Sequence, residues 1–154
     1  MKNSIDRINS FLVEVPPKVK KMPVKELSSR PSLNKWSKKE ILGHLCDSAV
    51  NNYNRFIRIQ FEPSPFKITP YDQNNWVRIN DYQNLTIEEI LTKWSFFNGE
   101  ILELLQRVAI EKYSLKCRIE DGTIHDLKWL VQDYVDHMEY HLNQILNESL
   151  NKQT

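Results

Sequence analysis

The chain has 154 residues, enough for one domain, and its 40% hydrophobic and 27% charged residues are typical of globular proteins. Twenty-one basic and twenty acidic residues give a net charge of +1, which provides no general field for binding nucleic acid. No apolar run approaches the roughly 20 residues needed to span a bilayer. We therefore expect a single domain over residues 1–154, with neither a nucleic-acid nor a membrane partner.

The small numbers of glycines and cysteines indicate the kind of fold and the redox compartment of the protein. Only three glycines occur, which favours long helices over tight turns. Cys46 and Cys117 have no paired spacing, and the N-terminus lacks the apolar core of a signal peptide, so we expect reduced thiols and a cytoplasmic location. The stretch 18–39 is rich in lysine and arginine, and we interpret it as a solvated connector.

The first predicted helix lies close to the N-terminus. Apolar side chains recur there at helical spacing: Ile5, Ile8, Leu12 and Val15. Proline lacks a backbone N–H, and its ring clashes with the preceding helical turn. We therefore expect this helix to end at Pro16 and Pro17.

The second and third predicted helices each begin with a capping box. Ser37 and Glu40 have the spacing of this motif, and Thr86 and Glu89 repeat it. The first box precedes an apolar stripe of Ile41, Leu45, Ser48, Asn52, Phe56 and Ile59. The second precedes a stripe of Ile90, Trp94, Phe97, Ile101, Leu104, Leu105 and Val108. We predict one helix from Ser37 to about residue 60 and another after Thr86.

A long, proline-containing connection over about residues 61–84 can travel the length of a bundle. We expect a short helix or turn within 71–80 and an irregular or hairpin-like stretch at 111–122. Thr123 is the predicted cap of the last helix, whose apolar stripe is Leu127, Leu130, Val131, Tyr134, Met138, Leu142 and Ile145. Together these elements predict an all-α fold: a four-helix bundle with an up-down-down-up course and a long crossover between the second and third helices.

Three of the four histidines lie beside predicted buried faces. At 100° per residue, His141 lies about 40° from the middle of the last helix's apolar stripe and His137 about 80° from it, on the same side. On the second helix, His44 lies about 60° from Ile41 by the same geometry. The imidazoles of His44, His137 and His141 could therefore meet between these two helices.

Three converging imidazoles can hold one divalent metal ion and leave a coordination position open, which is the catalytic pattern. The spacing alone leaves a second interpretation, in which the histidines make hydrogen bonds within the core. Asp47 and Asp133 lie one turn from His44 and His137, so they either orient these rings or face solvent. His125 precedes His137 by twelve residues, roughly 18 Å along a helix, and is excluded from the same ion.

Polar and aromatic residues near the histidines define a candidate pocket. Three of them are polar residues of the second helix, and two are aromatic residues of the long connection that either close the pocket or anchor the connection to the core. The candidates are Ser48, Asn51, Asn52, Tyr71 and Trp76. Cys46 falls on the opposite side of the second helix from His44, and we expect it to pack outward.

Three stretches carry a resemblance to a known family: KWSKKEILGHLCDSAVNNYNR, YDQNNWVRINDYQN and DYVDHMEYHLNQI, in this order. Through them the chain resembles, over about residues 31–145, the DinB superfamily of metalloproteins and its YfiT-like branch. The resemblance implies an up-down-down-up bundle that holds zinc or nickel through His44, His137 and His141, often in a homodimer.

The resemblance also implies a chemistry. Similar proteins are described as metal-dependent hydrolases, and relatives include S-transferases and an isomerase that use low-molecular-weight thiols such as bacillithiol or mycothiol. We expect a metal-dependent small-molecule enzyme in which an open metal position lowers the pKa of a water or of a thiol co-substrate. The sequence leaves both chemistries open. The alternatives are a metal-binding or stress-related protein without turnover and an interaction bundle whose histidines only pack.

Overall fold

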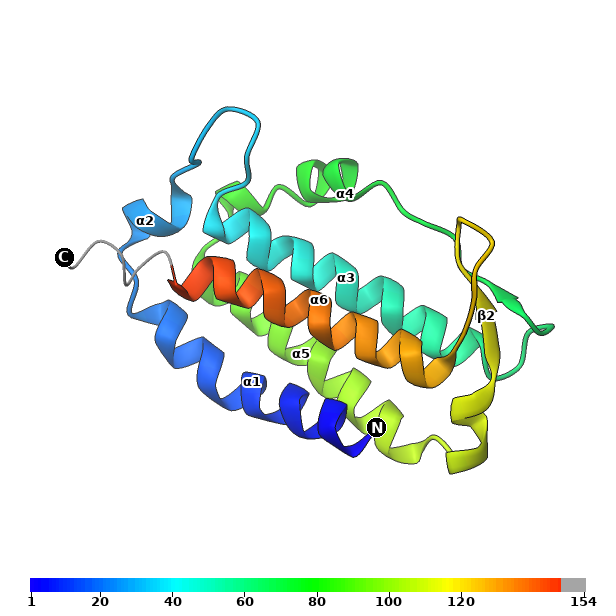
Figure 1. The fold of residues 1–154 in the computed structure, drawn as a ribbon. Helices are drawn as coiled ribbons and strands as arrows, with labels where there is room; N and C mark the ends of the chain where they lie inside the picture. Colours follow the sequence, from blue (N-terminus) through cyan, green and yellow to red (C-terminus); the bar gives the residue numbers. More distant parts are fainter. Residues whose placement is uncertain (148–154) are drawn as a thin grey trace.

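Four long helices form the body of the computed structural model, which describes residues 1–147 (Figure 1). They are α1 (Lys2–Lys20), α3 (Lys38–Arg58), α5 (Ile87–Arg107) and α6 (Leu127–Asn147). Both α1 and α3 pack against α5 and α6. Because α3 and α5 run in the same direction, the course is up, down, down, up, which confirms the predicted bundle (Figure 1). Residues 148–154 of the predicted domain lie outside the described residues.

The parallel direction of α3 and α5 requires a connection that returns along the bundle. This connection contains β1 (Phe66–Lys67), α4 (Gln73–Asn80) and the 3-10 helix η1 (Tyr82–Asn84). The helix α4 packs against α3, and the Asp72 carboxylate caps it by accepting a hydrogen bond from the backbone N–H of Asn75 at 3.0 Å. The short helix predicted within 71–80 is therefore confirmed.

A small three-stranded sheet closes one end of the bundle (Figure 1). Strands β2 (Lys116–Arg118) and β3 (Ile124–Asp126) form a hairpin, in which Gly122 has a φ of 88° that favours glycine. Its first strand lies in the predicted stretch 111–122, whereas its second strand lies beyond that stretch. Strand β1 pairs with β2 in parallel, a pairing between distant segments that was not predicted. Two short elements complete the order: α2 (Val24–Ser28) and η2 (Ile110–Ser114).

Both predicted capping boxes are present. At the start of α3, the Ser37 hydroxyl accepts from the N–H of Glu40 at 3.2 Å, and the Glu40 carboxylate accepts from the N–H of Ser37 at 2.9 Å. Thr86 and Glu89 repeat this exchange at 3.2 and 2.8 Å at the start of α5. These reciprocal bonds fix where α3 and α5 begin.

The predicted end of the first helix at Pro16 and Pro17 is wrong. The helix α1 continues through both prolines to Lys20. Val15 and Val19 are 2% and 0% exposed, so the buried stripe continues past the proline pair. Each proline in a helix interior costs about 3 kcal/mol, and burying one apolar side chain of this size returns roughly 1.5–3 kcal/mol. Burial along the whole of α1, where Ile8, Val15 and Val19 are all buried, is therefore what offsets the proline pair.

Two further local predictions need correction. The cap of α6 is Asp126 rather than Thr123, because residues 124–126 pair in the hairpin and Asp126 then accepts from the N–H of Trp129 at 2.9 Å. Cys46 does not pack outward: it is 1% exposed, and its thiol lies 3.7 Å from the carbonyl oxygen of Ile90 on α5. Among the described helices, none is long and apolar enough to cross a bilayer.

Candidate metal centre

Helices α3 and α6 bring the three predicted histidines together. His44 of α3 is fully buried, while His137 and His141 on successive turns of α6 are partly buried. One ring nitrogen from each lies within 4.8 Å of the other two. The Nε2 atoms of His44 and His137 are 3.2 Å apart. The three imidazoles therefore face a common point, as the helical geometry of the sequence predicts.

The spacing of one pair of these nitrogens matches that of two ligands on a tetrahedral metal ion, and all three lie within 4.8 Å of one another. Zn–N bonds of about 2.0–2.1 Å at tetrahedral angles place two ligand nitrogens roughly 3.3 Å apart, close to the 3.2 Å between His44 and His137. Imidazole nitrogen is a preferred donor for zinc and for nickel. Three protein ligands leave a fourth position of a tetrahedral ion open.

The protonation states of the histidines also suit metal binding. Burial lowers the pKa of His44 to about 3, with further lowering by the neighbouring His137 and His141. Burial and His141 lower the pKa of His137 to about 4. Burial lowers the pKa of His141 as well. At neutral pH all three rings are therefore neutral, and neutral imidazole is the form that binds a metal.

Gln144 fixes the orientation of His141. Its amide oxygen lies 2.7 Å from Nδ1 of His141, while its amide nitrogen donates to the hydroxyl of Tyr140 at 3.2 Å. Because an amide oxygen can only accept, Nδ1 of His141 carries the proton and Nε2 keeps its lone pair. Gln144 thus has the orienting role that the sequence analysis sought in Asp47 and Asp133.

The two predicted orienting carboxylates lie close to the site but have other contacts. Asp47 accepts hydrogen bonds from Tyr82 at 2.6 Å and Asn80 at 2.9 Å, and these tie α3 to the connection. Burial raises the pKa of Asp47 to about 6, against the lowering effect of these two donors. Nδ1 of His44 is buried without a hydrogen-bond partner among the described residues. Burial likewise raises the pKa of Asp133, which interacts electrostatically with Arg55.

The predicted pocket residues gather on α3 and the connection beside it. Ser48 is 3% exposed, and the ring centroid of Tyr71 lies 5.4 Å from that of Trp76. Burial raises the pKa of Tyr71 to about 12. The side-chain amides of Asn51 and Asn52 donate to carbonyl oxygens one turn earlier on α3, at 2.9 Å each.

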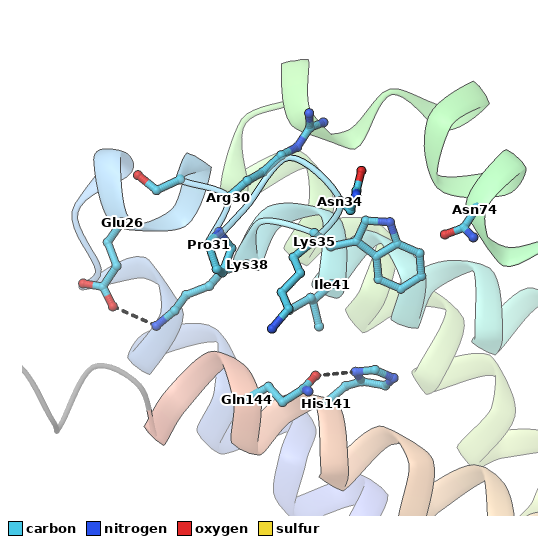
Figure 2. Close-up of a pocket in the computed structure, with 12 residues that line it drawn as sticks. Glu26, Arg30, Pro31, Asn34, Lys35, Lys38, Ile41, Asn74, His141 and Gln144 are labelled. Carbon is cyan, nitrogen blue, oxygen red and sulfur yellow. Dashed lines mark hydrogen bonds and ion pairs between the residues drawn. The ribbon is translucent and has the colours of Figure 1, made fainter.

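A cavity of about 660 Å³ lies beside His141, which forms part of its wall (Figure 2). The rest of the wall comes mainly from residues 26–41 and from Asn74 of α4. Trp36 belongs to this wall, and its ring centroid lies 4.9 Å from that of His44. The five predicted pocket residues are not among those that line this cavity. Most of this wall segment falls within the basic stretch 18–39, which was predicted to be a solvated connector because of its lysine and arginine content.

His125 stands apart from the cluster, as expected. It lies in β3, and its ring stacks on Trp129 with a centroid separation of 3.7 Å. Both cysteines are buried, and burial raises the pKa of each thiol. They are therefore poor nucleophiles at neutral pH.

The fold and the cluster define a four-helix bundle with a three-histidine site at the junction of two helices. A family comparison agrees with this class: the model of the DinB superfamily matches residues 14–145. The chain belongs to the DinB superfamily.

Two curated proteins resemble the chain. YfiT of Bacillus subtilis is 26% identical over 149 residues, with 94% of this chain and 83% of YfiT covered. A protein of Halalkalibacterium halodurans is 24% identical over 120 residues, with coverages of 78% and 69%. Both are named as candidate metal-dependent hydrolases.

Solved structures share the fold. The structure of YfiT has a TM-score of 0.85 at 22% identity, covers 99% of this chain and 86% of YfiT, and is described as having an unusual four-helix bundle topology. A mycothiol-dependent maleylpyruvate isomerase has a TM-score of 0.72 at 10% identity, and the match covers 92% of this chain and 58% of that one. This chain therefore corresponds to only part of the isomerase.

Proposed function

We propose that the protein is a metal-dependent small-molecule enzyme in which His44, His137 and His141 hold one zinc or nickel ion. The observation that carries the proposal is the convergence of three neutral imidazoles, one of which, His141, also lines a cavity of about 660 Å³. A divalent ion there would supply a Lewis acid that lowers the pKa of a water or thiol at its open position. A location in the cytoplasm and a homodimer remain predictions from the sequence.

The chain's own residues would prepare the site in three ways. The helices α3 and α6 hold Nε2 of His44 and Nε2 of His137 at ligand spacing, so little ordering of this pair is needed on binding. Gln144 keeps Nε2 of His141 free of a proton. Trp36 lies against His44 and shields that ring from water.

Two chemistries fit this arrangement: hydrolysis and transfer of a low-molecular-weight thiol. The names of the curated relatives support the first, and the mycothiol-dependent isomerase among the structural neighbours supports the second. A panel of thiols with monochlorobimane, run beside simple esters and amides, separates the two. Thiol transfer requires that the protein conjugates one class of thiol to monochlorobimane faster than the uncatalysed rate. The His141→Ala variant should lose this activity. Hydrolysis requires turnover of esters or amides with added metal and no thiol dependence.

A metal-binding protein without turnover is the alternative. Azide added to cobalt-substituted protein tests it directly. A change in the visible spectrum would reveal an exchangeable coordination position, which an enzyme needs. An unchanged spectrum would favour a closed metal site and a role in stability or stress.

A further inference from the structure

The cavity beside His141 carries an excess of positive charge. Three cationic side chains and a single carboxylate, that of Glu26, are among its lining residues. The cations are Arg30, Lys35 and Lys38. Three histidine ligands would also leave the charge of a bound divalent ion uncompensated, because imidazole binds a metal as a neutral ligand.

Two of the three cations are held by carboxylates of the chain. Arg30 donates from Nε to the Glu40 carboxylate at 2.9 Å. Lys38 donates to the Glu26 carboxylate at 2.8 Å and to the carbonyl oxygen of Ile145 at 2.7 Å. These hydrogen bonds link the cavity wall to the rest of the chain and give each of the two cations a carboxylate partner.

Lys35 differs from the other two. It is exposed, and within residues 1–147 no salt bridge joins its ammonium group to a carboxylate. Figure 2 shows its side chain extending into the cavity toward α6, on the side where His141 and Gln144 lie. A cation in this position can pair with a ligand that reaches the cavity without first breaking a bond within the protein.

We propose that the cavity takes a substrate or thiol co-substrate that carries a carboxylate or phosphate group, and that Lys35 pairs with that group. The proposal rests on the proposed function, since the reacting end of the ligand would lie at the histidine cluster. The cavity of about 660 Å³ has room for a small organic acid. Lys35 acts here as a specificity-determining residue and takes no part in the chemistry.

Two thiols that differ in charge test the proposal. Cobalt-substituted protein is titrated with mercaptosuccinate, a dicarboxylate, and with 1-thioglycerol, which is neutral, and the visible spectrum reports thiol binding. We expect Lys35→Ala to weaken mercaptosuccinate binding about fivefold, as for one charge-assisted contact in partial solvent, and to leave thioglycerol unchanged within twofold. Added salt should weaken mercaptosuccinate binding alone.

Lys25→Ala is the matched control, because Lys25 is an exposed lysine of the same basic stretch that does not line the cavity. Equal effects of the two substitutions, or equal effects on both thiols, would overturn the role of Lys35. Calorimetric titration of the metal-free protein with succinate provides an independent arm. If cobalt does not bind, the proposed function fails. The anion site would still be supported if Lys35→Ala loses succinate binding and Lys25→Ala keeps it. Succinate binding that is absent or insensitive to Lys35→Ala would reject it.

Discussion

The amide oxygen of Gln144 lies 2.7 Å from Nδ1 of His141, three residues earlier on the same helix. This bond makes Nε2 of His141 the ligand atom. Groups in this position typically change metal affinity by about 10–100-fold when removed. Gln144→Ala should therefore weaken zinc binding by at least about tenfold, measured by competition with a chromophoric chelator. Asn143→Ala, an exposed neighbour on α6, is the control, and equal affinities of the two variants would show that Gln144 does not orient the ligand.

Gly43 permits the close packing of Tyr82 on α3. A Cβ at this glycine would lie 2.1 Å from a ring carbon of Tyr82, which is 3% exposed and donates to Asp47. Gly43→Ala should displace the ring and lower the free energy of unfolding by about 2 kcal/mol, the range of core overpacking. Urea denaturation measures this change in the free energy of unfolding.

Gly99→Ala is the control for this substitution, because no heavy atom outside the immediate helix lies within 4 Å of the added Cβ. Alanine is the better helix former, so this variant should be stabilised by up to about 1 kcal/mol. A Gly43→Ala protein as stable as Gly99→Ala would mean that Tyr82 can move without cost.

Asp47 should titrate in an unusual range. Burial raises its pKa to about 6, while the Tyr82 and Asn80 donors oppose the rise. Tyr82→Phe removes one donor and should raise the pKa further, which carboxyl carbon NMR can measure. Because the folded pKa exceeds the ordinary value of 3.8, the folded state binds more protons, and this contribution to stability is lost as pH rises from about 4 through 6. Asp47→Asn should flatten that part of the stability profile, and a profile unchanged by this variant would contradict the assignment.

Metal removal should lower the melting temperature. An ion that binds only the folded state, at a hundred times its dissociation constant, adds about 2.7 kcal/mol of stability. For a chain of this size that is roughly 5–10 °C. Differential scanning calorimetry of zinc-loaded protein before and after chelation measures the change. Identical melting temperatures would favour histidines that serve only in packing.

The fold was predictable where a local signal agreed with packing. The boxes at Ser37 and Thr86 each supply two hydrogen bonds from residues three apart, so they mark helix starts without tertiary information. Pro16 and Pro17 show the opposite case, because burial of Val19 against the bundle is invisible to a rule about local backbone bonds. The parallel pairing of β1 with β2 joins distant segments and has no local signal.

The residues of the candidate site also divide into those that the sequence could predict and those that it could not. His44, His137 and His141 were predictable because their directions follow from helical periodicity alone. The role of Gln144 could also have been predicted, because its amide lies three residues after His141 on the same helix. The prediction considered only carboxylates as orienting groups. Trp36 and Lys35 precede α3 in a segment without periodicity, so their approach to the cavity depends on the path of the chain.

The metal content of purified, tag-free protein tests the central claim most directly. Plasma mass spectrometry should find about one equivalent of zinc or nickel in the wild type and in His125→Ala, whose imidazole stacks on Trp129 away from the cluster. His137→Ala and His141→Ala, shown by circular dichroism to be folded, should lose it. Wild-type protein that contains no such metal and cannot be loaded with zinc or nickel would contradict the account, as would folded histidine variants that retain the full equivalent.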